Sequence, residues 1–236
     1  MSVERNLLIS LLKLTKESGI LIEDVKTDSK IASTVTEKLL VKLQSEGLIY
    51  LKSDCVEVDN DMRLKLAVKA AALGSDIEQI SSFLCWQEFE EIAAFALKSF
   101  GYVVANNVRF KHGNRRWEID VVGFRNPLVI CIDCKHWQHA ISPSALKKIV
   151  DSQVERTKSF ADSLPNLSRN VVECTSWNKA KFVPVVLSLM PSASKFYDKV
   201  PIVPILQIQD FLNQLPLYSD SLRFFSKTFN RLTNNF

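Results

Sequence analysis

Hydrophobic and polar residues follow two different periods along the chain. In the first 60 residues, leucine, isoleucine and valine first recur with the spacing of helices and then alternate with polar residues as in strands. Ser29 is the expected N-cap of the longest helix, and Gly47 lies just past its end. The predicted elements are helices over 5–17, 20–25 and 30–46, followed by strands over 48–52 and 55–58.

Three helices followed by a two-stranded ribbon is the element order of a winged helix-turn-helix domain. Residues 1–60 resemble such a domain, and the resemblance implies that helix 30–46 docks on DNA. A protein-interaction or dimerisation module is the alternative, since no arginine lies between Arg5 and Arg63 and arginine is the residue best suited to reading guanine. The outward positions of the docking helix would be Lys30, Thr34, Lys38 and Lys42.

The second part of the chain has a mixed pattern. Residues 61–84 keep helical spacing on both sides of Gly74 and are expected to form a helical connector. Residues 85–236 then alternate between helical and strand-like segments, which predicts an α/β domain with an αβββαβ core. Ser142 and Pro143 are the expected N-cap and first residue of a long helix. The predicted elements are helices over 86–101, 142–164, 169–180 and 221–232, and strands over 102–110, 116–124, 127–135, 182–189 and 200–208.

The composition is that of a globular protein in a reducing compartment. Of the 236 residues, 47% are hydrophobic and 24% are charged, which excludes a disordered chain. No apolar run approaches the ~20 residues of a membrane-spanning helix, and Glu4 interrupts any secretory signal. Five scattered cysteines do not form a disulfide framework, so we predict a cytoplasmic protein without a membrane partner. The net charge of +4 permits nucleic acid as a partner without requiring it.

Three charged residues stand inside otherwise apolar strand segments. Asp120 is bounded by isoleucine and valine, and Asp133 and Lys135 follow a run of six apolar residues. Because side chains alternate along a strand, Asp133 and Lys135 share one face and Cys134 lies on the other. Two carboxylates and a lysine at adjacent strand ends suit phosphodiester hydrolysis with Mg²⁺ or Mn²⁺. A structural salt bridge between a carboxylate and Lys135 is the alternative.

This order of residues resembles the motif of the PD-(D/E)XK nuclease superfamily, whose restriction-endonuclease-like core is αβββαβ. Asp120, a connecting turn and the triplet 133–135 match the motif, although aspartate replaces the more frequent glutamate at position 133. Phe89-Glu90 also precedes Gly101-Tyr102 at the spacing found in Mrr-type restriction endonucleases and archaeal Holliday-junction resolvases.

The resemblance implies a metal-dependent DNA endonuclease that uses Mg²⁺ or Mn²⁺ and no small-molecule cofactor. A homodimer is expected by analogy, because cutting two strands usually requires two sites. A non-enzymatic DNA-binding regulator and an RNA-directed nuclease of the same fold are the alternatives. The implied catalytic residues are Glu90, Asp120, Asp133, Lys135 and Gln153, and the implied metal-binding residues are Glu90, Asp120, Asp133 and Cys134. Lys135 would assist the attacking water, and Gln153 would face the site from the following helix unless it is an ordinary exposed residue.

Basic residues cluster in the segment before Asp120. Residues 109–116 are expected to form a hairpin with Gly113-Asn114 at its tip, which could follow a phosphate backbone, and basic residues of the following helix, Arg156 among them, add to it. Solvated surface charge is the alternative. The predicted nucleic-acid-binding residues are Arg109, Lys111, Arg115, Arg116, Lys147 and Lys148.

Cys131 and Cys134 have the C-x2-C spacing found in many zinc sites. No second pair follows, and a spacing of three along a strand points the two thiols to opposite faces, so a structural zinc ion is not predicted. His112, His136 and His139 are expected to touch phosphate or water rather than to act as essential bases.

Overall fold

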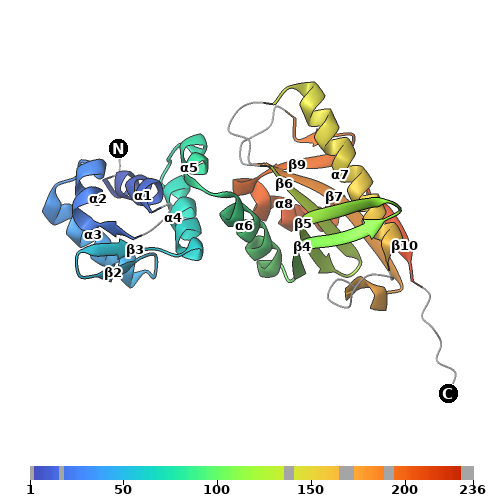
Figure 1. The fold of residues 1–236 in the computed structure, drawn as a ribbon, viewed down its shortest axis with the longest axis horizontal. Coiled ribbons are helices and arrows are strands. Elements are labelled where there is room, and N and C mark those ends of the chain that lie inside the picture. Colours follow the sequence, from blue (N-terminus) through green and yellow to red (C-terminus); the bar gives the residue numbers. More distant parts are fainter. Residues whose placement is uncertain (1–2, 16–18, 136–140, 165–172, 189–193, 230–236) are drawn as a thin grey trace, which may run out of the picture. The chain divides into compact units, whose positions relative to one another are not determined.

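The computed structural model describes residues 3–15, 19–135, 141–164, 173–188 and 194–229 (Figure 1). The chain divides into two compact units, Met1–Phe89 and Glu90–Phe236. The division falls inside helix α6 (Trp86–Ser99). Within the described ranges, no helix is both long enough and apolar enough to cross a membrane.

The first unit combines helices with a small sheet. The leucine stripe of α1 is fully buried, at Leu7, Leu8, Leu11 and Leu12, as its helical spacing predicts. The strands form a sheet in the order β1-β3-β2. The elements are α1 (Val3–Leu14), β1 (Ile20–Leu21), α2 (Ile22–Ser29), α3 (Ser33–Ser45), β2 (Tyr50–Lys52), β3 (Cys55–Glu57), α4 (Asn60–Ala72) and α5 (Ile77–Phe83).

The start of α3 differs from the prediction. Ser29 is the last residue of α2 and does not cap α3, whose N-cap position is held by Ala32 without a side-chain hydrogen bond. The reason is the backbone of Lys30, which adopts a left-handed conformation (φ 55°) and so ends α2 at Ser29. The predicted second helix also begins later, because Ile20 and Leu21 pair with β3 as a short strand.

A buried ion pair lies among the helices of the first unit. The Arg63 guanidinium contacts the carboxylate of Glu88 through Nε, and the two residues are only 3% and 1% exposed. The other oxygen of Glu88 accepts the Cys85 N–H at 2.6 Å. The remaining partners of the guanidinium are the carbonyls of Leu12 (2.9 Å) and Phe83 (2.7 Å) and the hydroxyl of Thr15 (2.7 Å). Arg63 on α4 thereby ties together the ends of α1 and α5, so residues 61–84 form part of this unit's core.

The second unit is a mixed α/β sheet with helices, consistent with the expected nuclease-like fold. Its strands lie in the order β4-β5-β6-β7-β9-β8, and β10 also pairs with β7. The first three strands are antiparallel, whereas β6, β7 and β9 are parallel. The elements after α6 are β4 (Val103–His112), β5 (Arg115–Arg125), β6 (Leu128–Lys135), α7 (Pro143–Ser163), η2 (Glu173–Ser176), β7 (Lys179–Ser188), β8 (Phe196–Tyr197), β9 (Val200–Pro204), η3 (Ile205–Gln207), α8 (Ile208–Tyr218) and β10 (Phe225–Thr228).

Helices α6 and α7 pack against opposite faces of this sheet. Phe160 of α7 lies 5.4 Å from Phe110 and 5.9 Å from Phe182 between ring centroids, in a core that includes Val122. The neighbouring Gly123 points to the other face, where a Cβ would come within 2.9 Å of Leu97 on α6. The candidate strands β5 and β6 therefore lie between these two helices.

Two predicted helices of the second unit are wrong. In the described part of 169–180, residues 173–176 form a short 3₁₀ turn and Lys179 already begins β7. Residues 169–172 lie outside the described residues. Within the predicted helix 221–232, residues 225–228 instead form strand β10, which pairs with the first half of β7, from Phe225 opposite Phe182 to Thr228 opposite Lys179. Residues 230–232 lie outside the described residues. That half of β7 offers an open edge, and pairing with it overrides the local helical pattern.

Candidate active site

The site lies where strands β5 and β6 separate. The two strands pair from Arg125–Leu128 as far as Val121–Ile132, after which β6 continues along β7 to Lys135. The N–H of Cys134 accordingly meets a side chain of β5: it donates to Oδ2 of Asp120 at 2.7 Å. Asp120 therefore stands at the fork, on a strand adjacent to that of Asp133.

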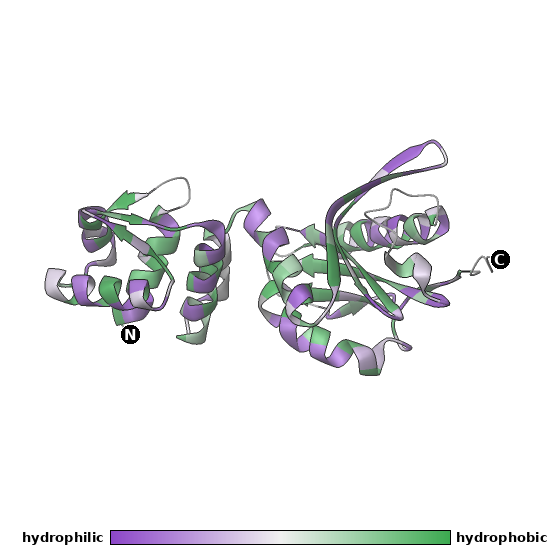
Figure 2. Cartoon of the chain, turned by 90° about the horizontal axis from the view of Figure 1, so that it is seen from below, coloured by the Kyte–Doolittle hydropathy of each residue, from purple (hydrophilic) through white to green (hydrophobic). Residues whose placement is uncertain are grey.

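A break in the β4–β5 ladder accompanies the fork. Residues 106 and 121 are paired, as are 108 and 119, but Asn107 and Asp120 between them are not. Asn107 has a left-handed backbone (φ 51°), which asparagine tolerates better than most residues. Beyond this break the hairpin extends away from the sheet, with a hydrophilic tip (Figure 2).

Asp133 is buried on the α7 face and bound by two cations. Nζ of Lys135 lies 3.0 Å from Oδ1 and 2.9 Å from Oδ2, so the two residues share a strand face as predicted. Nη1 of Arg156 on α7 also contacts Oδ1. Asp133 itself is 2% exposed, whereas the Lys135 side chain is 28% exposed. The lysine is thus the more accessible member of this group.

Gln153 on α7 faces the sheet beside Arg156 and is buried. Its side chain is fully buried, and Nε2 donates to the Cys131 carbonyl of β6 at 2.7 Å and more weakly to the Val185 carbonyl of β7 at 3.4 Å. Its Oε1 accepts from Nη1 of Arg156 at 3.0 Å. The amide is therefore neither exposed nor hydrogen-bonded to a candidate carboxylate, because it is used to join α7 to the sheet.

Burial and the neighbouring carboxylates raise the pKa of Asp120. Burial raises the pKa of Asp120 to about 6, the N–H of Cys134 works against this shift, and the negative charges of Asp133 and Glu90 add to it. Glu90 belongs to α6, on the face of the sheet opposite to α7, and is partly buried. The structure thus brings Glu90 and Asp133 within electrostatic reach of Asp120.

The Cys134 thiol does not suit the metal-binding role assigned to it. Burial raises its pKa well above the ordinary value, and the nearby charges of Asp120 and Glu90 raise it further. A thiol binds metal as the thiolate, which this environment disfavours. Cys131, which completes the C-x2-C pair, lies in the core on the α7 face. The backbone of Cys134, through its bond to Asp120, is the part that belongs to the site.

The three carboxylates suit a hard divalent cation in chemical type. Mg²⁺ and Mn²⁺ prefer oxygen ligands, and a cation would offset the mutual repulsion that contributes to the raised pKa of Asp120. Among the residues that the structure describes, no three His, Cys, Asp or Glu side chains are grouped closely enough to hold a metal ion. The donors fit such an ion by chemistry, but the Asp133 carboxylate is occupied by Lys135 and Arg156.

The basic hairpin is divided between two faces. Arg115 stacks on Trp117, 3.7 Å from the ring centroid, and pairs with Glu155 of α7. On the other face Lys111 lies directly opposite Arg116, and neither has an ion-pair partner among the described residues. Like charges in this position repel, so the pair favours an anionic ligand. Of the other predicted contacts, Arg109 pairs with Glu118 (3.1 Å), and Lys147 and Lys148 are exposed on α7.

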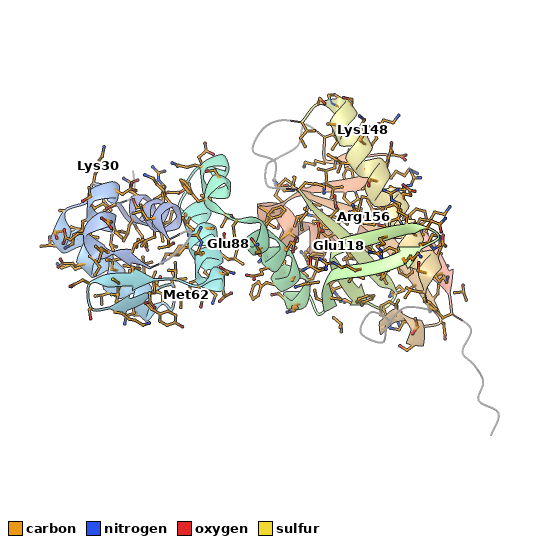
Figure 3. All side chains as sticks on the ribbon, viewed as in Figure 1. Lys30, Met62, Glu88, Glu118, Lys148 and Arg156 are labelled. Atoms are coloured by element: carbon orange, nitrogen blue, oxygen red, sulfur yellow. The ribbon has the colours of Figure 1, made fainter. Side chains whose placement is uncertain are left out.

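Sequence reasoning treated Arg156 as one basic residue among several on a helix, but in the structure it contacts Asp133. Figure 3 labels Arg156 on α7. The available signal was its spacing from Gln153, because residues three apart lie on one helix face. Of the predicted histidines, His112 lies 3.2 Å from the Ser163 hydroxyl. His136 and His139 lie outside the described residues.

Residues 86–188 match the family described as the nuclease-related domain, NERD. This segment runs from α6 to the end of β7 and contains Glu90, Asp120, Asp133, Lys135 and Gln153. The candidate site therefore lies within a part of the chain that is similar to nuclease domains.

The individual relatives share little sequence identity with this chain. An uncharacterized protein of Archaeoglobus fulgidus is 26% identical over 134 residues, which cover 56% of this chain and 93% of that protein. Protein VC1899 of Vibrio cholerae is similar in structure over 92% of this chain, with a TM-score of 0.38 and 13% identity. Can2 of Sulfobacillus thermosulfidooxidans, solved in complex with cyclic tetra-adenylate, is similar over 91%, with a TM-score of 0.36 and 14% identity. This chain spans 50% of each of these two structures.

Proposed function

We propose that the second unit is a metal-dependent nuclease that hydrolyses phosphodiester bonds in DNA. The observation that carries this proposal is the fork between β5 and β6, where Asp120 and Asp133 lie on adjacent strands beside Lys135. The fork lies in the segment that resembles nuclease-related domains. A purely structural salt bridge would not require the neighbouring Asp120, whose charged form is disfavoured by burial.

Each residue of the fork has a distinct proposed role. Asp120 and Glu90 would hold Mg²⁺ or Mn²⁺, and Asp133 would join them as a third oxygen donor. The bound ion would polarise the phosphate and make a water molecule more acidic. Lys135 cannot ligate a cation, but its accessible ammonium can stabilise negative charge that develops on water or phosphate.

DNA is the proposed substrate because exposed basic residues lie on the β4–β5 hairpin and on α7, the elements that supply Asp120 and Arg156. Lys111 and Arg116 on the hairpin and Lys147 and Lys148 on α7 would contact phosphates. The first unit, with its helices and three-stranded sheet, would add a winged-helix contact through Lys30 and Lys38. Lys42, the third lysine predicted to face DNA, is already paired with Glu4 at 3.0 Å. We further propose a cytoplasmic homodimer, in which two sites cut two strands.

The test is a cleavage panel with the full chain. Duplex, four-way junction, flap and single-stranded DNA, with matched RNA, would be incubated with Mg²⁺ or Mn²⁺ and with chelator. We expect cleavage of at least one DNA that chelator abolishes and that Asp120→Asn, which retains the acceptor for the Cys134 N–H, reduces severely. If only RNA is cleaved, the substrate is RNA rather than DNA. Tight DNA binding without any cleavage would favour a non-enzymatic regulator.

A further inference from the structure

Arg156 makes a contact that the roles above do not use. Its Nη1 donates both to Oδ1 of Asp133 and to Oε1 of Gln153, the latter at 3.0 Å. The Arg156 side chain is 17% exposed, and Asp133 is its only carboxylate partner among the described residues. A largely buried guanidinium on a candidate metal ligand needs an explanation, because arginine on a helix normally extends into water.

Gln153 fixes the position of this guanidinium. Its amide is fully buried, and Nε2 donates to the carbonyl of Cys131, two residues before Asp133 on the same strand. With the nitrogen side committed to the strand, the oxygen side is left to accept from Arg156. The chain from Cys131 through Gln153 to Arg156 therefore holds the guanidinium at one place relative to the Asp133 carboxylate.

Asp133 consequently has two cations for one negative charge. Lys135 contacts both carboxylate oxygens and Arg156 contacts one of them. A divalent cation approaching Asp133 would meet both positive charges at short range in a buried place, where Coulomb repulsion is strong. Lys135 is needed beside the reacting phosphate under the proposed function, so Arg156 is the cation that can leave.

We propose that Arg156 is a positioning residue that competes with the metal ion for Asp133. This inference rests on the proposed metal-dependent function of the fork. In the free protein the guanidinium holds Asp133, and the carboxylate becomes a metal ligand only when Arg156 leaves Oδ1. A released guanidinium can bind phosphate, whose oxygens match its paired N–H donors as well as carboxylate oxygens do. Metal binding and phosphate binding then strengthen each other through linkage.

The first test is Mn²⁺ binding to the full chain, measured by isothermal titration calorimetry without nucleic acid. Arg156→Met keeps the length of the side chain but removes its charge, and should bind Mn²⁺ about tenfold more tightly than the wild type. Arg156→Lys, which keeps the charge, should stay closer to the wild type. Lys158→Met removes a charge from the exposed side of the same helix and should change the affinity by less than about twofold.

The outcomes separate this inference from the proposed function. If Asp120→Asn weakens Mn²⁺ binding but folded Arg156→Met binds no more tightly than wild type, the metal site stands and the competition is wrong. If no form of the chain binds Mn²⁺, the metal site itself fails, and both proposals fail with it.

A second test uses the wild-type chain and so does not depend on a variant that folds. The guanidinium ¹⁵N signals of Arg156, assigned with Arg156→Lys, should shift when Mg²⁺ is added, and signals that stay unchanged at saturating Mg²⁺ would overturn the proposal. In cleavage assays, Arg156→Met should reach its half-maximal rate at a lower Mg²⁺ concentration and have a lower maximal rate. A merely structural role would not produce this split.

Discussion

Each unit of the molecule contains a buried arginine–carboxylate pair, and the two pairs are built differently. In the first unit, both oxygens of Glu88 and all three nitrogens of the Arg63 guanidinium have partners, and neither residue reaches solvent. In the second unit, Asp133 is equally buried, but its partners Arg156 and Lys135 are 17% and 28% exposed.

The difference indicates what each pair is for. Every guanidinium nitrogen of Arg63 and both carboxylate oxygens of Glu88 are already bonded within the protein and buried, so the contribution of this pair is to hold helices together. The single negative charge of Asp133 is contacted by two cations, Lys135 and Arg156, and Asp133 lies near Asp120, whose pKa is raised. One of two cations on a carboxylate can be exchanged for another cation. Removing Arg63 would instead leave the buried Glu88 carboxylate without a counterion.

The largest effect on stability is expected from breaking the Arg63–Glu88 pair. Arg63→Met leaves Glu88 charged and buried, and should lower the free energy of unfolding of the first unit by about 3–5 kcal/mol. Urea unfolding followed by hydrogen exchange would measure the loss separately in α1, α4 and α5. Lys52→Met removes one side of the exposed Lys52–Glu57 pair and should change the free energy of unfolding far less, because solvent screens this pair. Equal effects of both substitutions would contradict the structural role of Arg63.

The corresponding change in the second unit should act on rate rather than stability. Lys135→Ala should slow cleavage by roughly 10²–10³-fold, because the ammonium stabilises charge that develops only in the transition state. Mn²⁺ binding should remain. Lys98→Ala, at the exposed end of α6, is the matched control and should cut normally. If Lys135→Ala cuts at the wild-type rate, or excess Mg²⁺ restores it fully, the proposed role is wrong.

Asp120 should make the stability of the second unit depend on pH. Because its pKa is about 6 in the folded chain and near 3.8 when unfolded, the folded state binds the proton more tightly, and stability decreases as pH rises from about 4 to 6. Asp120→Asn removes this cost, so without metal it should be more stable than wild type at pH 7.5, by roughly 1 kcal/mol after allowance for solvent screening. The gain should disappear near pH 4. Urea unfolding at the two pH values is the measurement, and a gain that does not depend on pH would count against this environment.

The smallest effect concerns the repulsive pair on the hairpin. Lys111→Glu places opposite charges across the strands and should stabilise the second unit by about 0.2–1 kcal/mol. The same substitution should weaken DNA binding and lower the slope of log affinity against log salt by about 1. Lys111→Gln should be intermediate in both measurements. Unchanged DNA binding would mean that this face of the hairpin does not contact phosphate.

The features that local chemistry determines were predictable from the sequence. Ser142 caps α7 and Pro143 begins it, as their residue types require, and the apolar runs around Asp120 and Asp133 became adjacent strands. Strand alternation also placed Lys135 beside Asp133. These predictions needed only periodicity, capping and the cost of burying charge.

The features that distant contacts determine were not predictable. Strand β10 forms because β7, some 45 residues earlier, offers it an edge, although its own sequence has helical spacing. The place of Arg156 likewise depends on its contacts with Asp133 and Gln153, which its spacing along α7 allows but does not specify. Gln153 was predicted from its position alone, and that position did not reveal its partners, the Cys131 carbonyl and Arg156.

The left-handed Asn107 has a consequence for how the protein tolerates mutation. The residue is exposed, and it lies opposite Asp120 at the gap in the β4–β5 ladder. Only glycine, asparagine and aspartate adopt such a backbone at low cost, so most other side chains would press the hairpin toward regular pairing and shift Asp120. In a library selected for activity, position 107 should therefore accept very few residues. An exposed position can be constrained by the path of the backbone alone, without contributing any chemistry of its own.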